Sequence, residues 1–434
     1  MKRETWNMKL GTLPSFFVIW TGQAFSLIGS SVAQFALVWW LTQLTGSATV
    51  LATATMAALV PGIILGPLAG AYVDRWNRRT VMIVADGLVA LAALWLAYMF
   101  WSGAMQPWHV YVIVFIRALG GTFHWPAMQA STSLMVPKEH LTRVAGLNQT
   151  MNGVINITAP PLGALLLALL PLHGIMLLDV GTALLAISTL FLVHVPQPQR
   201  LLAASGAGPG ANGPKTSIWV DVREGLRYVW HWPGVLAVLV MAVLINFLLA
   251  PTGALLPLLV TKYFHGQAPQ LAGLESAWGI GVILGGLSLS VWGGFKRRVY
   301  TSLLALALMG LGFITIGFTP ATAFWLAVVG NLVAGFMNPL VNGPLFAILQ
   351  TTVAPEMQGR VFTVIGSLSS AMTPLSLAIA GPVADVVGVR PWFVMGGVLC
   401  VLMGLGACFV PVIVNLEKNN GSQEAVAQAE KSWA

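Results

Sequence analysis

Charged residues are scarce in this chain. Only 8% of its 434 residues are Asp, Glu, Lys or Arg, whereas soluble proteins carry roughly a quarter. Hydrophobic residues make up 57%, and the few charges are clustered between apolar runs long enough to cross a bilayer as helices. A soluble globular domain is therefore excluded. A membrane barrel is excluded too, because its strands would be short segments of alternating polarity.

Cysteines and catalytic motifs are sparse as well. The two cysteines, Cys400 and Cys408, are eight residues apart in one apolar run, a spacing that suits neither a disulfide nor a metal site. We find no Gly-rich phosphate loop, no His-Glu-x-x-His sequence and no nucleophile elbow. We therefore expect no metal, no cofactor and no enzymatic activity.

The apolar runs predict an all-α polytopic membrane protein with twelve transmembrane helices in two pseudo-symmetric six-helix bundles. The bundles are expected at residues 1–195 and 233–415, with a cytoplasmic linker at 196–232 and a disordered tail at 416–434. The expected spans are, approximately, 14–42, 48–73, 80–101, 108–130, 145–171, 174–195, 234–260, 270–294, 299–319, 322–349, 361–387 and 391–414.

Positive charge is distributed unevenly between the two sides of these spans. Of the 21 Lys and Arg residues, all except Arg117, Lys262 and Arg390 fall in alternate connections or at the termini. This positive-inside pattern predicts a cytoplasmic-membrane protein with both termini in the cytoplasm. The net charge of +8 therefore reflects topology, and we expect no nucleic-acid partner.

The expected linker contains one amphipathic segment. Residues 197–215 are rich in Ala, Gly, Pro and Gln and are typical of a flexible connection. Apolar residues then recur at helical spacing: Trp219, Val222, Leu226, Val229 and Trp230. We expect this helix to lie in the cytoplasmic interface of the membrane. The alternative is packing on a soluble surface, but no soluble domain is present.

Two pairs of prolines indicate an internal repeat. Pro126 and Pro137 are eleven residues apart, and so are Pro344 and Pro355. An Arg-Val pair follows each, and the two arginines are separated by half the chain length. A weaker repeat relates the charged turn at 74–79 to the turn at 294–298, which lacks the Asp. A duplicated six-helix unit explains both.

Charges inside the expected spans are rare, and each needs an explanation. Arg117 is deep in the fourth span and costs at least about 2.5 kcal/mol to bury, so it needs a partner or a water-filled cavity. Contact with Gln23 is plausible from their depths. Arg117 could tune the protonation of a nearby carboxylate, or it could be purely structural. Asp86 could pair with Arg117 or with the basic turn, as a structural clamp or as a proton carrier.

Two further carboxylates, Asp179 and Glu275, are expected nearer the ends of their spans and complete the proton-coupling candidates. Glu275 is of interest because desolvation at the rim of an apolar cavity favours the protonated form of a carboxylate, and hydration reverses this. Asp385 is better explained as a hydrated carboxylate at a helix end. His124 is expected to be a bonded structural histidine.

Amide side chains recur along several spans. Some hold helices together. Those that line a central cavity would offer orienting hydrogen bonds to a large, mostly apolar solute. The candidates are Gln23, Gln34, Asn152, Asn246, Asn338 and Asn342.

A glycine-rich helix that runs directly into a charged turn resembles the signature of the major facilitator superfamily. Gly62, Gly66 and Gly70 share one helix face, which would allow another backbone to approach closely. The matching residues of the turn, taken as the gating motif, are Gly70, Asp74, Arg75, Arg78 and Arg79. Asn77 stands where the family pattern usually has a second glycine. The departure is mild, because Asn also tolerates a left-handed backbone.

Further motifs look like the macrolide-efflux branch of the drug:proton antiporters. They include Ala85-Asp86, Phe115-Ile-Arg117, Thr122-Phe-His124-Trp-Pro126 and Val136-Pro-Lys-Glu-His-Leu-Thr-Arg143. This resemblance implies alternating access, export of small amphiphilic compounds such as macrolides, and energy from the proton gradient. We expect a monomer in the lipid bilayer. The alternatives are a siderophore, lipid or nutrient carrier, a uniporter, a membrane-bound enzyme and a receptor.

Overall fold

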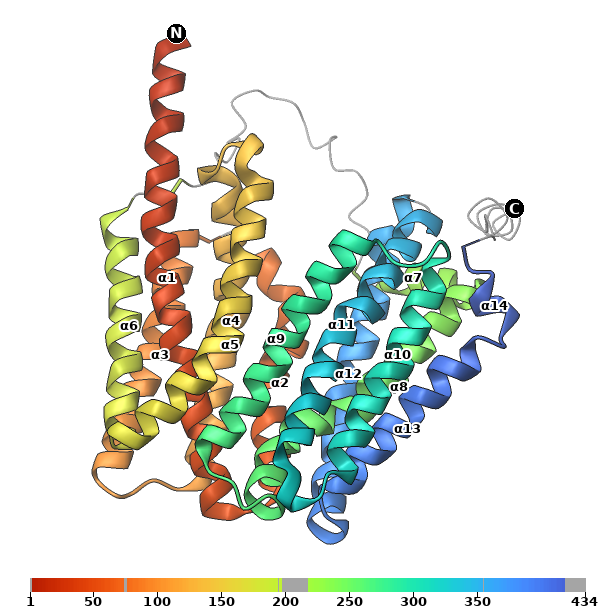
Figure 1. Cartoon of the computed structure of the whole chain (residues 1–434). Helices are drawn as coiled ribbons and strands as arrows, with labels where there is room; N and C mark the ends of the chain where they lie inside the picture. Colours follow the sequence, from red (N-terminus) through yellow and green to blue (C-terminus); the bar gives the residue numbers. More distant parts are fainter. Residues whose placement is uncertain (1, 74–75, 194, 197–217, 354, 418–434) are drawn as a thin grey trace. The chain divides into compact units, whose positions relative to one another are not determined.

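The structure is a computed structural model that describes residues 2–73, 76–193, 195–196, 218–353 and 355–417 (Figure 1). Within these ranges the chain is helical throughout, apart from short connections, and contains no β-strand. Twelve of the described helices are long and apolar enough to cross a membrane, as the sequence predicts. The chain forms two compact units. The first unit is Met1–Ser205 with Gly266–Ser276, and the second unit is Gly206–His265 with Ala277–Ala434.

The first unit contains the first six helices of the chain. These are α1 (Lys2–Thr45), α2 (Ala48–Val73), α3 (Arg78–Trp101), α4 (Pro107–Met135), α5 (Leu141–Leu169) and α6 (Leu172–Leu192), with the 3-10 turn η1 (Lys138–His140) before α5. The start of α9 (Ala268–Trp292) also belongs to this unit, up to Ser276.

The second unit contains the rest of α9 and the other helices. These are α7 (Ile218–His231), α8 (Pro233–Leu258) with the π turn η2 (Leu259–Tyr263), α10 (Arg298–Phe318), the 3-10 turn η3 (Ala321–Ala323), α11 (Phe324–Thr352), α12 (Pro355–Val387), α13 (Arg390–Ala407) and α14 (Pro411–Val414). The last span is shorter than predicted: α13 ends at Ala407 rather than near 414. The chain turns there, and Pro411, which favours the first position of a helix, begins α14.

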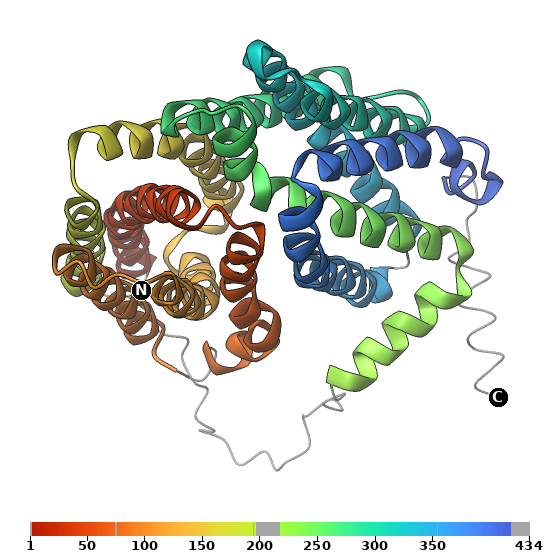
Figure 2. The same cartoon turned by 90° about the horizontal axis from the view of Figure 1, so that it is seen from below.

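Both units use the same scheme of helix packing, which confirms the predicted duplication. In the first unit α1 packs on α5 and α6, while α3 packs on α4 and α6. In the second unit α8 packs on α12 and α13, while α10 packs on α11 and α13. The corresponding helices of the two units occupy the same position in the order of the six spans in their half of the chain: α8 corresponds to α1, α10 to α3, α11 to α4, α12 to α5 and α13 to α6. Figures 1 and 2 show these neighbours from two directions.

Glycines allow the closest of these helix contacts. On α10 and α13, Gly310 and Gly397 face each other so closely that a Cβ built on Gly397 would lie 2.5 Å from the Gly310 carbonyl oxygen. On α1, Gly22 faces Thr189 of α6, and Gly29 faces Thr182 of the same helix. Small residues at such positions let transmembrane helices approach and gain dispersion contacts, since lipid supplies no hydrophobic driving force.

The glycine face of α2 behaves differently from the prediction. A Cβ added to Gly66 or Gly70 would have no neighbouring atom within 4 Å, and one added to Gly62 would meet only Thr122 Oγ1 at 3.9 Å. The described residues of the first unit therefore make no close backbone approach to this face. A spacing of four places glycines on one face, but it does not specify a partner, and α2 packs on α4 without using this face for backbone contact.

Helix α7 packs on the bundle. Tyr228 and Val229 are buried together with Val235 of α8 and Val361 of α12, whereas Leu226 and Trp230 remain exposed. The expected apolar face of α7 is thus divided: Val229 packs against other helices, whereas Leu226 and Trp230 stay exposed. The side chains of Trp219 and Val222 lie outside the described part of the chain, as does the linker at 197–217.

The segment after α14 also packs on the second unit. Leu416 is only 2% exposed, and Glu417 Oε1 accepts a hydrogen bond of 3.1 Å from the backbone N–H of Val299, at the start of α10. The carboxylate complements the positive end of the helix dipole. Packed structure therefore extends two residues beyond the boundary expected at 415, and residues 418–434 lie outside the described part.

We expect Gly397→Ala to destabilise the protein, because the added methyl group would force the α10 and α13 backbones apart at a cost of about 1–3 kcal/mol. The matched control is Gly406→Ala on the same helix, where no atom lies within 4 Å of the new methyl group. Thermal unfolding of the purified protein in detergent would compare them. Equal melting temperatures for the two variants would contradict the packing described here.

Candidate functional site

Polar side chains of four helices meet inside the first unit in two layers. Gln23 and Ser30 are seven residues apart on α1, and Arg117 and His124 are seven apart on α4. Seven residues are about two turns, or roughly 10.5 Å along a helix. Each layer contains one residue from each of these helices and one carboxylate from a third helix.

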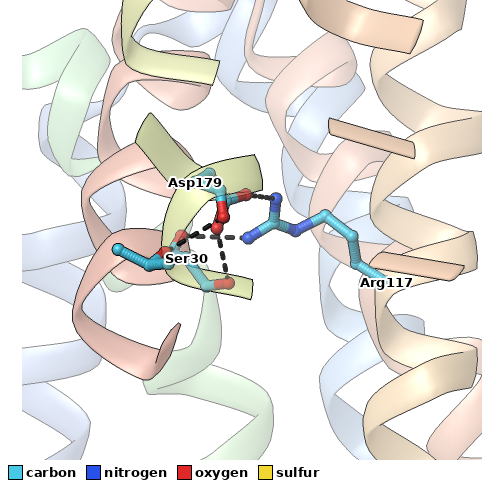
Figure 3. A network of polar contacts seen from close by, with 4 residues as sticks. Ser30, Arg117 and Asp179 are labelled. Atoms are coloured by element: carbon cyan, nitrogen blue, oxygen red, sulfur yellow. Dashed lines mark hydrogen bonds and ion pairs between the residues drawn. The ribbon is translucent and has the colours of Figure 1, made fainter. Parts of the chain in front are cut away.

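The arginine layer consists of Ser30, Arg117 and Asp179 (Figure 3). Arg117 Nη1 lies 2.5 Å from Asp179 Oδ2, and Arg117 Nη2 donates to the Ser30 carbonyl oxygen at 3.1 Å. Ser30 Oγ donates to Asp179 Oδ1 at 2.9 Å. The Asp179 side chain is fully buried and that of Arg117 is 10% exposed, so this ion pair is removed from solvent and both carboxylate oxygens are occupied.

The histidine layer consists of Gln23, Asp86 and His124. Gln23 Nε2 donates to Asp86 Oδ2 at 2.8 Å, and both residues are buried. His124 Nε2 lies 3.4 Å from Asp86 Oδ1. This contact is longer than the charge-assisted hydrogen bonds of the arginine layer. Asp86 therefore has one firm partner and one loose partner.

Close helix packing brings each carboxylate into its layer. Gly29 lets α1 approach Thr182 of α6, which places the adjacent Ser30 beside Asp179. Gly120 performs the same task between α3 and α4, since a Cβ there would lie 3.2 Å from the Ala85 carbonyl oxygen, next to Asp86.

The predicted pairing of these side chains is wrong. Gln23 binds Asp86 rather than Arg117, and Arg117 binds Asp179 rather than Asp86. Asp86 contacts Gln23 and His124 in place of the basic turn's described arginines, Arg78 and Arg79. Depth along a helix could be counted from the sequence, but the face that each side chain occupies could not. Asp179, which was expected nearer the end of its span, is fully buried.

Sequence reasoning missed the part played by two residues. Ser30 contacts both members of the ion pair, and His124 contacts Asp86. The available signal was the seven-residue spacing from Gln23 to Ser30 and from Arg117 to His124, which places each pair on one helix face.

In the basic turn, Asp74 and Arg75 lie outside the described residues, but the two following arginines bind helix ends. Arg78 Nη1 donates to the Ala130 carbonyl oxygen near the end of α4 at 2.8 Å. Arg79 Nε and Nη2 donate to the last carbonyl groups of α6, those of Leu190 and Phe191, at 2.7 and 2.8 Å. Cations are stabilised at such carboxyl ends. These arginines therefore tie the start of α3 to α4 and α6.

Asn77 is the N-cap of α3. Its backbone is extended, with φ −68° and ψ 113°, so the left-handed conformation that Asn tolerates is not used here. Its Oδ1 accepts a hydrogen bond of 3.2 Å from the Thr80 N–H, which is a standard use of Asn before a helix.

Glu275, in the first turns of α9, is half-buried and forms no hydrogen bond or ion pair with any residue that the structure describes. The adjacent Ser276 Oγ donates to the Ile157 carbonyl oxygen of α5 at 2.9 Å, which fixes this part of α9 on the first unit. Asp385, near the end of α12, is exposed.

The remaining cavity candidates are divided between the units. Gln34 and Asn152 of the first unit and Asn338 of the second are half-buried. Asn246 and Asn342 are exposed and donate to carbonyl groups four residues earlier in their own helices. Whether these amides line one cavity stays a prediction. In the described ranges, no three His, Cys, Asp or Glu residues are grouped as a metal site would require.

Comparison with known proteins places the chain in a family. Residues 19–377 match the Major Facilitator Superfamily. The chain belongs to this superfamily. Among solved structures, a bacterial homologue of the human lysosomal transporter Spinster shares 12% sequence identity and superposes with a TM-score of 0.67, over 95% of this chain and 97% of that one. This likeness concerns the fold.

Two curated proteins are similar to this chain over nearly its whole length. Macrolide efflux protein A of Streptococcus pyogenes is 32% identical, over 96% of this chain and 98% of its own length. The multidrug efflux pump Tap of Mycolicibacterium fortuitum is 30% identical, over 90% of this chain and 94% of its own length.

We expect the arginine layer to behave as a coupled pair in this Major Facilitator protein. Arg117→Met or Asp179→Leu alone should each cost about 3–5 kcal/mol, because each leaves one buried charge without its partner. The double variant should cost less than either single variant. Thermal unfolding in detergent completes this double-mutant cycle, with Asp385→Asn as an exposed control. Additive losses would contradict a direct interaction.

Proposed function

We propose that this protein exports amphiphilic compounds such as macrolides from the cell in exchange for protons. The observation that carries the proposal is the similarity to Macrolide efflux protein A across 96% of the chain. A multidrug efflux pump is similar over almost the same range, which favours export of a broad class of amphiphilic solutes over uptake of one nutrient. A siderophore, lipid or nutrient carrier of this fold is the alternative.

The buried polar layers support coupling to protons. Ionisable groups within transmembrane helices are costly to insert and are usually retained for function. Asp86 and the Arg117–Asp179 pair contact α1 in two separate layers, and the half-buried Glu275 stands without a bonded partner among the described residues. We propose that one of these buried polar sites binds the exchanged proton during the transport cycle.

The charged turn between α2 and α3 is proposed as the gating element. Arg78 and Arg79 hold the ends of α4 and α6, so a displacement of the turn would move several helix ends together. Gly70, Asp74 and Arg75 complete the motif. The glycine face of α2, which has open space beside Gly66 and Gly70, leaves room for a second packing arrangement.

The solute is proposed to bind between apolar helix faces, oriented by a few amides. Most ligand cavities are apolar with a small number of placed hydrogen-bonding groups. Gln34, Asn152, Asn246, Asn338 and Asn342 are the proposed contributors. We also propose that the protein acts as a monomer in the cytoplasmic membrane, with both termini in the cytoplasm, because the Lys and Arg distribution favours that orientation.

Solute flux in proteoliposomes tests the proposal. With an acidic lumen, we expect vesicles containing the protein to accumulate radiolabelled erythromycin above its external concentration, since protons leaving the lumen drive the solute inward. A protonophore should abolish accumulation, and protein-free vesicles are the control. Erythromycin that reaches equal concentrations on both sides of the membrane, with or without the pH gradient, would indicate a uniporter. Counterflow with a siderophore or nutrient but not with erythromycin would favour the alternative carrier.

A further inference from the structure

The two polar layers differ in whether their cation can release a proton. In the arginine layer, Arg117 keeps its charge because a guanidinium is not deprotonated in proteins. Its partner Asp179 has both oxygens engaged, one by Arg117 and one by Ser30. A proton that entered this layer would have to displace a charge-assisted hydrogen bond from a fully buried carboxylate. The arginine layer is therefore a fixed structural pair.

The histidine layer has a vacant position for a proton. His124 Nε2 is buried and has no hydrogen-bond partner among the residues the structure describes, although Asp86 Oδ1 lies 3.4 Å away. Histidine is the side chain that ordinarily changes its charge between about pH 5 and 8. A proton added to Nε2 would convert a buried, unpaired nitrogen into a donor directed at a carboxylate.

Few other charges influence this position. Helix α3 contributes Asp86 and α1 contributes the uncharged Gln23. Helix α2, which also packs on α4, carries no Asp, Glu, Lys, Arg or His, and its Tyr72 is 44% exposed. On α4 itself, Arg117 is about two turns away, roughly 10.5 Å, and is already paired with Asp179. Asp86 is thus the charged group in contact with His124.

We propose that His124 carries the exchanged proton, with Asp86 as its positioning partner, and that Arg117 and Asp179 do not. This proposal rests on the proposed function, because it assigns the site of its coupling. The step makes and breaks only one N–H bond. A proton from the extracellular side adds to the Nε2 lone pair, and the same proton later leaves to the cytoplasm. Asp86 remains a carboxylate, held by the Gln23 amide throughout.

Protonation of His124 has a mechanical consequence for α3 and α4. The imidazolium would draw Asp86 into a hydrogen bond, and Gly120 already holds the two helices in backbone contact at this level. The same two helices are also joined at the start of α3, where Arg78 binds the Ala130 carbonyl oxygen of α4. A change in the charge of His124 is therefore transmitted along α3 to the basic turn.

The test separates proton coupling from solute exchange in proteoliposomes. For His124→Gln we expect erythromycin counterflow, measured without a pH gradient, to stay within about twofold of wild type, whereas gradient-driven accumulation and its dependence on luminal pH should be lost. A merely structural histidine would reduce both activities together. The matched control is His173→Gln near the start of α6, which should change neither.

Accumulation by His124→Gln at the wild-type level would overturn the assignment. It would also be overturned if Glu275→Gln, and not His124→Gln, lost accumulation while keeping exchange. If His124→Gln loses both activities, the Asp86→Asn variant tests the assignment instead. The Asn side-chain oxygen can still accept the hydrogen bond from Gln23, so this variant keeps that contact. Exchange without accumulation in Asp86→Asn supports the pair, and loss of both there overturns it. Wild-type protein that exchanges erythromycin without any response to the gradient would instead refute the proposed proton coupling itself.

Discussion

The Arg117–Asp179 ion pair is the interaction on which the first unit depends. A charge in the hydrocarbon region is tolerated only when it is paired or hydrated, so this pair requires α1, α4 and α6 to meet at one level. Ser30 closes the arrangement by contacting both partners. Because α1 and α4 then have a fixed register, the residues two turns away, Gln23 and His124, are brought to Asp86 without further adjustment.

Much of the fold could be predicted because the bilayer restricts the alternatives. Long apolar runs must be helices in lipid, so all twelve spans followed from the sequence, and the paired prolines revealed the duplication. The ends of the helices were less predictable. The early end of α13, the packing of Val229 and the burial of Leu416 depend on tertiary contacts that leave no periodic signal.

The buried charges of the two layers were singled out from the sequence, whereas Ser30, the part played by His124 and the contacts among these residues were not. Scarcity of charge was enough to select Asp86, Arg117 and Asp179, since each had to be paired inside the membrane. Partner choice depended on glycines such as Gly29 and Gly120, which decide the helices that approach most closely. The glycines of α2 show the limit of that signal, because an equally regular spacing has open space beside it.

Glu417 has a consequence for the order in which the protein is made. It caps the start of α10, yet it is separated from Val299 by 118 positions along the chain. Translation proceeds from the amino terminus at about 5–20 residues per second, so several seconds pass between emergence of the helix and arrival of its cap. Until then the Val299 N–H at the start of α10 must find a hydrogen-bond acceptor in water or in another segment of the protein. The second unit thus reaches its final form only after residue 417 has been synthesised.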